Sequence, residues 1–177
     1  MLGCGGVGLS AVAVAASVGA HVVAVDTSPA ALEVARSLGA SSSVLAVPGT
    51  DVPSAVHDLT GGGAHVALDA RGSPATSRDS VLSLRRRGRQ VQVGLVPAAG
   101  GRVDVPLERV IAWELDLLGS HGMPAGDYPA MLADVAAGRL DPGALVRAHV
   151  PLADLAGELL AMGDRPPTGV VVCDPRT

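Results

Sequence analysis

The sequence contains no lysine, no asparagine and no phenylalanine, and it has one tryptophan and two cysteines. Without large aromatic side chains the core must be built from Ala, Val and Leu, which suits parallel strands covered by helices. Cys4 and Cys173 lie at opposite ends of the chain and form no spaced motif. They indicate a reducing compartment without a disulfide framework, so we expect a cytoplasmic location.

Charge and hydropathy exclude several further classes. The net charge of −4 argues against a nucleic-acid surface. The arginine-rich run 85–89 is expected at the end of a helix, where cations complement the dipole. The apolar stretch 9–25 is interrupted by Gly19-Ala20-His21, so we expect neither a signal peptide nor a membrane span. The five histidines are scattered without the short spacers typical of zinc ligands, and we expect no metal site in this chain.

Residues 3–8 read G-x-G-x-x-G, a pattern typical of a turn from a strand into a helix that holds a pyrophosphate. Gly3 would allow the tight turn, Gly5 would let the backbone approach the phosphates, and Gly8 would let the helix pack on the strand. Asp26 ends the next apolar run, at the spacing expected of an acid that binds a ribose. The same carboxylate could instead cap the helix that begins near Ser28.

Strand and helix patterns alternate along the chain. Strands are expected at 21–25, 43–47, 65–68 and 90–94, and helices at 9–18, 29–38, 52–59 and 74–84, with a glycine-rich turn at 61–63 closing the third helix. After residue 94 we expect strands at 103–105, 116–119 and 169–173, a helical turn at 107–113, and helices at 127–137, N-capped by Asp127, and at 153–162. Short connections of this kind predict an α/β fold with a doubly wound parallel sheet of the Rossmann type, followed by a C-terminal helical and strand extension. Asp69 is expected mainly to cap the loop after the fourth strand.

With these elements placed, the chain resembles the cofactor-binding, C-terminal part of the zinc-dependent alcohol dehydrogenases, in the medium-chain dehydrogenase/reductase family. The resemblance rests on segments throughout the chain: GCGGVGLSAV, VVAVDTSPAALEVARSLGA, DLTGGGAHVALDA, LRRRGRQVQVGL, ERVIAWELDLLGSHG and GVVVCDP. It implies an oxidoreductase with NAD as cofactor. In that family a GroES-like domain comes first and supplies the zinc ligands, so we expect this chain to be a fragment with a truncated first strand and no catalytic or metal residues of its own.

The resemblance also implies a set of cofactor-binding residues. These are Gly3, Gly5, Gly6, Val7 and Gly8 at the pyrophosphate, Asp26 at the adenosine ribose, Ala70 and Arg71 beside the cofactor, Val93, Gly94 and Leu95 under the nicotinamide ribose, and Ser120 and His121 near the carboxamide.

The resemblance further implies the domain organisation and the partners. Residues 1–122 would form the NAD-binding domain, and residues 123–177 would pack on the catalytic domain of the intact enzyme. Residues 102–119 would pair across a two-fold axis in a homodimer. Two alternatives stay open, because a methyltransferase-like nucleotide domain also has a glycine-rich turn with a following acid, and a non-catalytic remnant could bind the cofactor alone.

Overall fold

The computed structural model describes residues 1–96, 103–164 and 168–176 of the chain. Its main sheet is parallel and contains β1 (Val23–Asp26), β2 (Ser42–Leu45), β3 (Ala64–Asp69), β4 (Leu84–Gln92) and β5 (Asp116–Gly119). Leu2 forms parallel bridges to both Val25 and Asp69, so it lies between β1 and β3. The order is therefore β2, β1, Leu2, β3, β4, β5, which confirms the predicted doubly wound arrangement.

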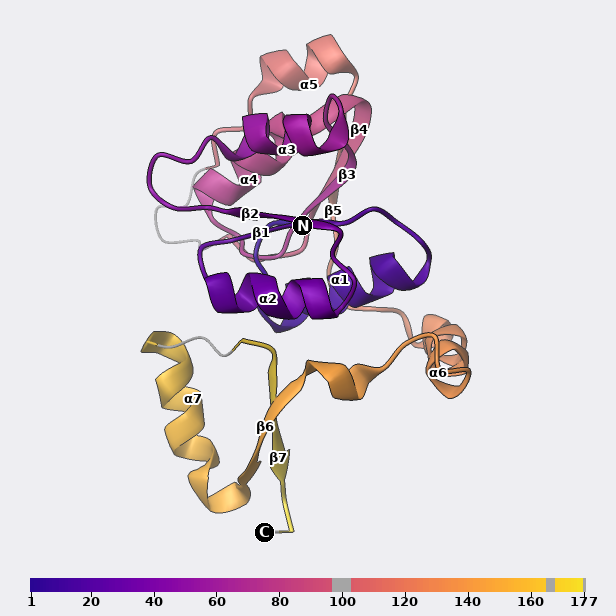
Figure 1. The fold of residues 1–177 in the computed structure, drawn as a ribbon, viewed down its shortest axis with the longest axis vertical. Coiled ribbons are helices and arrows are strands. Elements are labelled where there is room, and N and C mark those ends of the chain that lie inside the picture. Colours follow the sequence, from indigo (N-terminus) through magenta and orange to yellow (C-terminus); the bar gives the residue numbers. More distant parts are fainter. Residues whose placement is uncertain (97–102, 165–167, 177) are drawn as a thin grey trace.

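Helices cover both faces of this sheet. They are α1 (Gly6–Ser17), α2 (Pro29–Ser37), α3 (Val52–Thr60), α4 (Pro74–Leu82) and α5 (Leu107–Trp113). Figure 1 shows α1 and α2 on one side of the strands and α3 and α4 on the other. The alternation of side chains along 22–25 explains this arrangement, because Val22 and Ala24 pack with α1 and α2 whereas Val23 and Val25 pack with α3.

The helices begin and end where the sequence supplies caps. The Ser28 hydroxyl accepts a hydrogen bond from Ala31 N at 3.3 Å, with Pro29 in the first turn of α2. Gly61 adopts the left-handed conformation that ends α3, as the glycine-rich turn predicted. Helix α4 starts with a reciprocal capping box between Ser73 and Thr76.

The C-terminal region forms a second, smaller unit in Figure 1. It contains η1 (Ala125–Asp127), α6 (Tyr128–Ala136), η2 (Pro142–Leu145), β6 (Val146–Pro151), η3 (Leu152–Asp154), α7 (Leu155–Asp164) and β7 (Val170–Asp174). Strands β6 and β7 pair in parallel as a separate sheet. Leu145 packs against the core formed by α1 and α2, so this region contacts the main domain.

Four local predictions were wrong. Strand β6 was not predicted, and the expected strand at 103–105 has no regular secondary structure. The side chain of Asp127 makes no cap hydrogen bond to α6. The arginine run belongs to β4 rather than to the end of α4, because β4 pairs with β3 from Leu84 onward through an irregularity in register.

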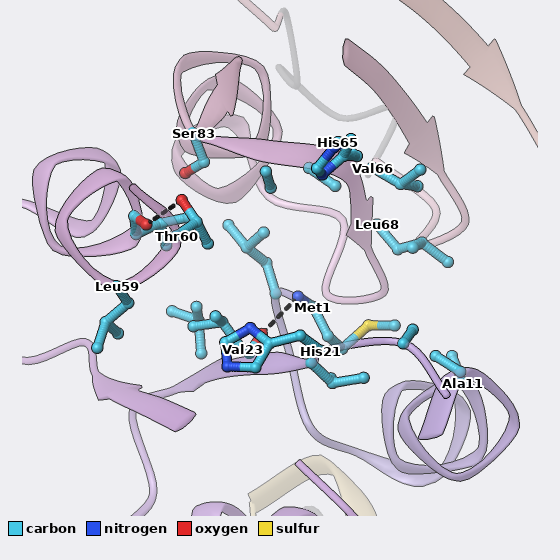
Figure 2. Close-up of a pocket in the computed structure, with 18 of the residues that line it drawn as sticks. Met1, Ala11, His21, Val23, Leu59, Thr60, His65, Val66, Leu68 and Ser83 are labelled. Atoms are coloured by element: carbon cyan, nitrogen blue, oxygen red, sulfur yellow. Dashed lines mark hydrogen bonds between the residues drawn. The ribbon is translucent and has the colours of Figure 1, made fainter. Parts of the chain in front are cut away.

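A cavity of about 730 Å³ opens at the amino ends of β1 and β3, next to α1 and α3. Figure 2 shows Met1 at its centre, with His21 and His65 from the starts of the two strands around it. The Met1 amino group donates to the carbonyl oxygen of Val23 at 2.8 Å, and burial lowers its pKa to about 6. None of the predicted site residues lines this cavity.

Among the described residues no helix has the length and apolar character needed to cross a bilayer.

Candidate functional site

The predicted site residues lie at the carboxyl ends of the parallel strands, in the loops that follow them and in the first turn of α1. Leu2 leads into the glycine turn, Asp26 ends β1, Asp69 ends β3, Gln92 ends β4, and Ser120 directly follows β5. Because the strands run in the same direction, these loops form one continuous edge. Chain connections leave toward opposite faces on the two sides of Leu2, which is where a ligand crevice forms in such folds.

Gly3, Gly5 and Gly8 of the turn each lack a side chain for a different physical reason. Gly3 has φ +86°, and a Cβ there would lie 2.9 Å from the backbone nitrogen of Arg71. A Cβ on Gly8 would overlap the carbonyl oxygen of Gly3, so α1 can pack on this turn only without a side chain. Gly5 is exposed in ordinary extended geometry and has no atom within 4 Å of its Cβ position. Open space therefore faces the start of α1, where the first backbone N–H groups lack partners within the helix.

The Asp26 carboxylate connects the glycine turn to the chain that follows β1. Its Oδ2 accepts from Cys4 N at 2.7 Å, and its Oδ1 accepts from Ser28 N at 2.8 Å. The second bond closes a local turn before α2, whose cap is the Ser28 hydroxyl rather than Asp26. The first bond holds the carboxylate against the backbone of the glycine turn, next to Gly5 in sequence.

Cys4 lies inside the glycine motif but is not a nucleophile. Its side chain is buried, and its thiol lies 3.8 Å from the carbonyl oxygen of Val25. Burial, together with the negative charge of Asp26, raises the pKa of the Cys4 thiol to about 11. The thiol is therefore neutral at physiological pH, and its role is to fill the core under α1.

The loops after β3 and β4 interlock on the other side of the glycine turn. Val93 N and Gly94 N both donate to the carbonyl oxygen of Asp69, at 3.0 and 2.8 Å. A Cβ on Gly94 would overlap the nitrogen of Gly72, so the two loops touch through their backbones. Arg71 and Leu95 extend exposed side chains from this pair of loops.

Ser120 and His121 complete the edge beyond β5. Ser120 N donates to the carbonyl oxygen of Gln92 at 2.9 Å, which fixes the start of this loop next to β4. Both side chains are exposed. The predicted residues are thus brought together along one edge by five different segments.

Sequence reasoning missed a buried polar cluster behind this edge. Thr76 and Ser77 on α4 and Gln92 on β4 all bond to the Asp69 carboxylate, which was predicted only as a loop cap. The available signal was Gln92 itself, a polar residue that alternates with Val91 and Val93 in the predicted strand 90–94.

The residues do not fit a zinc site. In the part of the chain that the structure describes, no group of three or more His, Cys, Asp or Glu side chains comes close enough together to hold a metal ion.

Comparisons with known proteins agree with this fold. The zinc-binding dehydrogenase family model matches residues 6–137, so the chain belongs to that family. Its cofactor-domain architecture is that of the medium-chain dehydrogenases.

Individual relatives are similar at modest identity. D-xylulose reductase A of Aspergillus niger is 30% identical over 161 residues, which cover 87% of this chain and 44% of that protein. Sorbitol dehydrogenase of Bacillus subtilis is 32% identical over 148 residues, covering 82% and 41%. The crystal structure of 2R,3R-butanediol dehydrogenase from Bacillus subtilis superposes with a TM-score of 0.87 at 26% identity, covering 98% of this chain and 49% of that one. The chain therefore spans less than half the length of these relatives.

Proposed function

We propose that this chain is the NAD(H)-binding portion of a zinc-type alcohol or polyol dehydrogenase. The observation that carries the proposal is the open space at Gly5, immediately before α1, in a turn that the bond from Cys4 N holds to Asp26. A dinucleotide pyrophosphate has the charge and size for this place, because unpaired N–H groups and the positive end of the α1 dipole face it.

The proposed ligand follows the edge across the strands. The amides of Gly5, Gly6 and Val7 would hold the pyrophosphate, and Asp26 would accept hydrogen bonds from the adenosine ribose. The loops at 70–71, 93–95 and 120–121 would border the nicotinamide half. On this assignment residues 1–122 form the cofactor domain, and residues 123–177 extend from it toward the rest of a longer dehydrogenase.

When bound, NAD supplies the hydride chemistry, and this chain binds and orients it. The roles assigned to these residues are in cofactor binding, and the described residues do not assemble a zinc site. We therefore propose that the chain by itself binds cofactor without oxidising alcohols, and that the activity of the whole enzyme depends on residues outside it.

The Asp26→Ser variant tests the assignment of the ribose acid. The carboxylate would repel a 2′-phosphate, so we expect the preference for NADH over NADPH to fall by about tenfold. Calorimetric titration of both nucleotides measures the ratio. Asp58→Ser on α3 removes the same charge from an exposed position and should leave the ratio unchanged. An unaltered ratio in Asp26→Ser would remove Asp26 from the site.

We also propose a homodimer through the edge of the sheet at β5. Arg102, the first residue of the predicted pairing segment, lies outside the described residues, and within that segment only β5 is a strand. β5 pairs with β4 on one side, while Leu117 and Leu118 are 38% and 46% exposed. An apolar edge strand of this kind is a template for pairing with a second copy.

Sedimentation velocity at micromolar concentration is expected to show a dimer. Leu117→Glu should shift it toward monomer, because a charge would be buried at the strand edge. Leu160→Glu changes an 82% exposed residue on α7 and should leave the dimer intact. A wild-type protein that sediments as a monomer would contradict the proposal.

A further inference from the structure

The Asp69 carboxylate is completely buried behind the site edge and lies against none of the space proposed for the ligand. We propose that Asp69 is a positioning residue that holds both loops of the nicotinamide half in place. The inference rests on the proposed function and assigns one acid to each half of the site. Asp26 organises the adenosine half, and Asp69 organises the nicotinamide half.

One oxygen of Asp69 holds the loop after β3. Its Oδ1 accepts from Arg71 N at 2.9 Å and from Gly72 N at 3.0 Å. These amides belong to a short turn between β3 and the capping box of α4, where no strand partner is available to them. Bonds from backbone amides to a buried carboxylate are stronger than bonds between neutral groups, so the turn has one preferred conformation.

The other oxygen reaches the loop after β4 through Gln92. Oδ2 accepts from Thr76 Oγ1 at 3.1 Å, from Ser77 Oγ at 2.9 Å and from Gln92 Nε2 at 2.9 Å. Gln92 Nε2 also donates to the carbonyl oxygen of Gly94 at 2.9 Å. The same carboxylate is therefore linked by one side chain to the loop that contains Val93, Gly94 and Leu95.

The orientation of the Gln92 amide is fixed by its neighbours. Its Oε1 accepts from Gln90 Nε2 at 3.0 Å and lies 3.0 Å from Ser77 Oγ, whose single proton is shared between Oε1 and Asp69, while its Nε2 donates to Asp69 and Gly94. Reversing the amide would bring two donors together at Gln90 and two acceptors together at Gly94. The network has one consistent arrangement, which needs an acceptor at Oδ2 of residue 69.

A buried carboxylate is costly to desolvate unless its oxygens are satisfied. Five donors satisfy this one, and all five come from the two loops or from the elements that support them. The adenosine side is tied separately, through the bond from Cys4 N to Asp26. Loosening Asp69 should therefore affect one half of the ligand site and spare the other.

The test is Asp69→Asn, which keeps the shape of the side chain. Asn Oδ1 can still accept from the amides of Arg71 and Gly72, but its NH₂ group then faces the NH₂ group of Gln92. We expect NADH affinity to fall by about tenfold, as for loss of a bond to a charged group, and the affinity for ADP to stay within about twofold. ADP carries the adenosine and pyrophosphate without the nicotinamide riboside, so the ratio of the two dissociation constants isolates the second half of the site.

Two further variants keep the test decisive. Asp79→Asn makes the same chemical change on α4 at a half-buried carboxylate whose pKa burial raises, and it should alter neither affinity. Ser77→Ala removes the one hydroxyl donor that lies between Asp69 and Gln92, so it should give a smaller loss of NADH affinity in the same direction. It serves as the test if Asp69→Asn does not fold. Hydrogen exchange of the Arg71 and Gly72 amides should be faster in Asp69→Asn and in Ser77→Ala than in the wild type, while exchange of the α2 amides should not change.

The outcomes separate the two proposals. Faster exchange with a raised NADH-to-ADP ratio of dissociation constants supports the positioning role. An equal loss of affinity for NADH and ADP, or unchanged hydrogen exchange at Arg71 and Gly72, overturns the positioning role. The proposed function still stands in that case if the wild-type chain binds NADH. If the wild-type chain binds neither nucleotide, the proposed function fails, and the ligand role of Asp69 fails with it.

Discussion

Replacing Gly8 with alanine is expected to lower the free energy of unfolding by about 3 kcal/mol, because the new Cβ would overlap the carbonyl oxygen of Gly3. The obstructing atom belongs to the backbone of a turn whose first residue needs positive φ, so the clash cannot be relieved by a side-chain rotation. Helix α1 would have to move away from Leu2 at the centre of the sheet. Urea unfolding followed by circular dichroism measures the loss.

Gly157→Ala is the matched control for this change. Gly157 lies in α7 with nothing within 4 Å of its Cβ position, so alanine should be neutral or stabilise the chain by up to about 1 kcal/mol. If Gly8→Ala unfolded at the same urea concentration as the wild type, the close packing of α1 on the turn would be disproved.

The second large effect is expected at Gly5, where the same substitution should spare the fold and remove the ligand. Gly5 has φ −77°, which alanine adopts freely, and its Cβ would project into empty space. That space is the proposed pyrophosphate position, so we expect NADH affinity to fall by about a hundredfold, equivalent to ~3 kcal/mol of lost amide–phosphate bonding. Calorimetric titration together with the unfolding midpoint separates binding from stability.

Gly126→Ala provides the comparison for binding. Gly126 lies in η1, far along the chain from the turn, and also has an open Cβ position. This variant should bind NADH as the wild type does. Wild-type affinity in Gly5→Ala would show that no phosphate approaches the turn.

The first half of the fold could be predicted because each element carries its own local signals. Ser28 and Pro29 mark the start of α2, and Gly61 marks the end of α3. Strand β6 was missed because its partner, β7, lies about twenty residues further along the chain, and no local pattern predicts such a pairing. The arginine run shows the same limit, since pairing with β3 prevailed over the local preference of cations for a helix end.

Some features of the candidate site could also be predicted from the sequence, and others could not. The positive φ of Gly3 and the contact of Gly8 with the Gly3 carbonyl lie within the motif, so its spacing could predict them, whereas the approach of Arg71 to Gly3 depends on the loop after β3. The network around Asp69 joins residues from β3, α4 and β4, and its geometry depends on which face of α4 packs on the sheet. A sequence can indicate a polar residue in a strand, such as Gln92, but only the packed structure shows which groups it bonds.

Calorimetric titration of the purified wild-type chain with NADH, NADPH and S-adenosylmethionine tests the central claim most directly. The account predicts saturable binding of one NADH per chain, weaker binding of NADPH because of Asp26, and no binding of S-adenosylmethionine. Saturation by S-adenosylmethionine, or failure of NADH to bind at millimolar concentration, would contradict it.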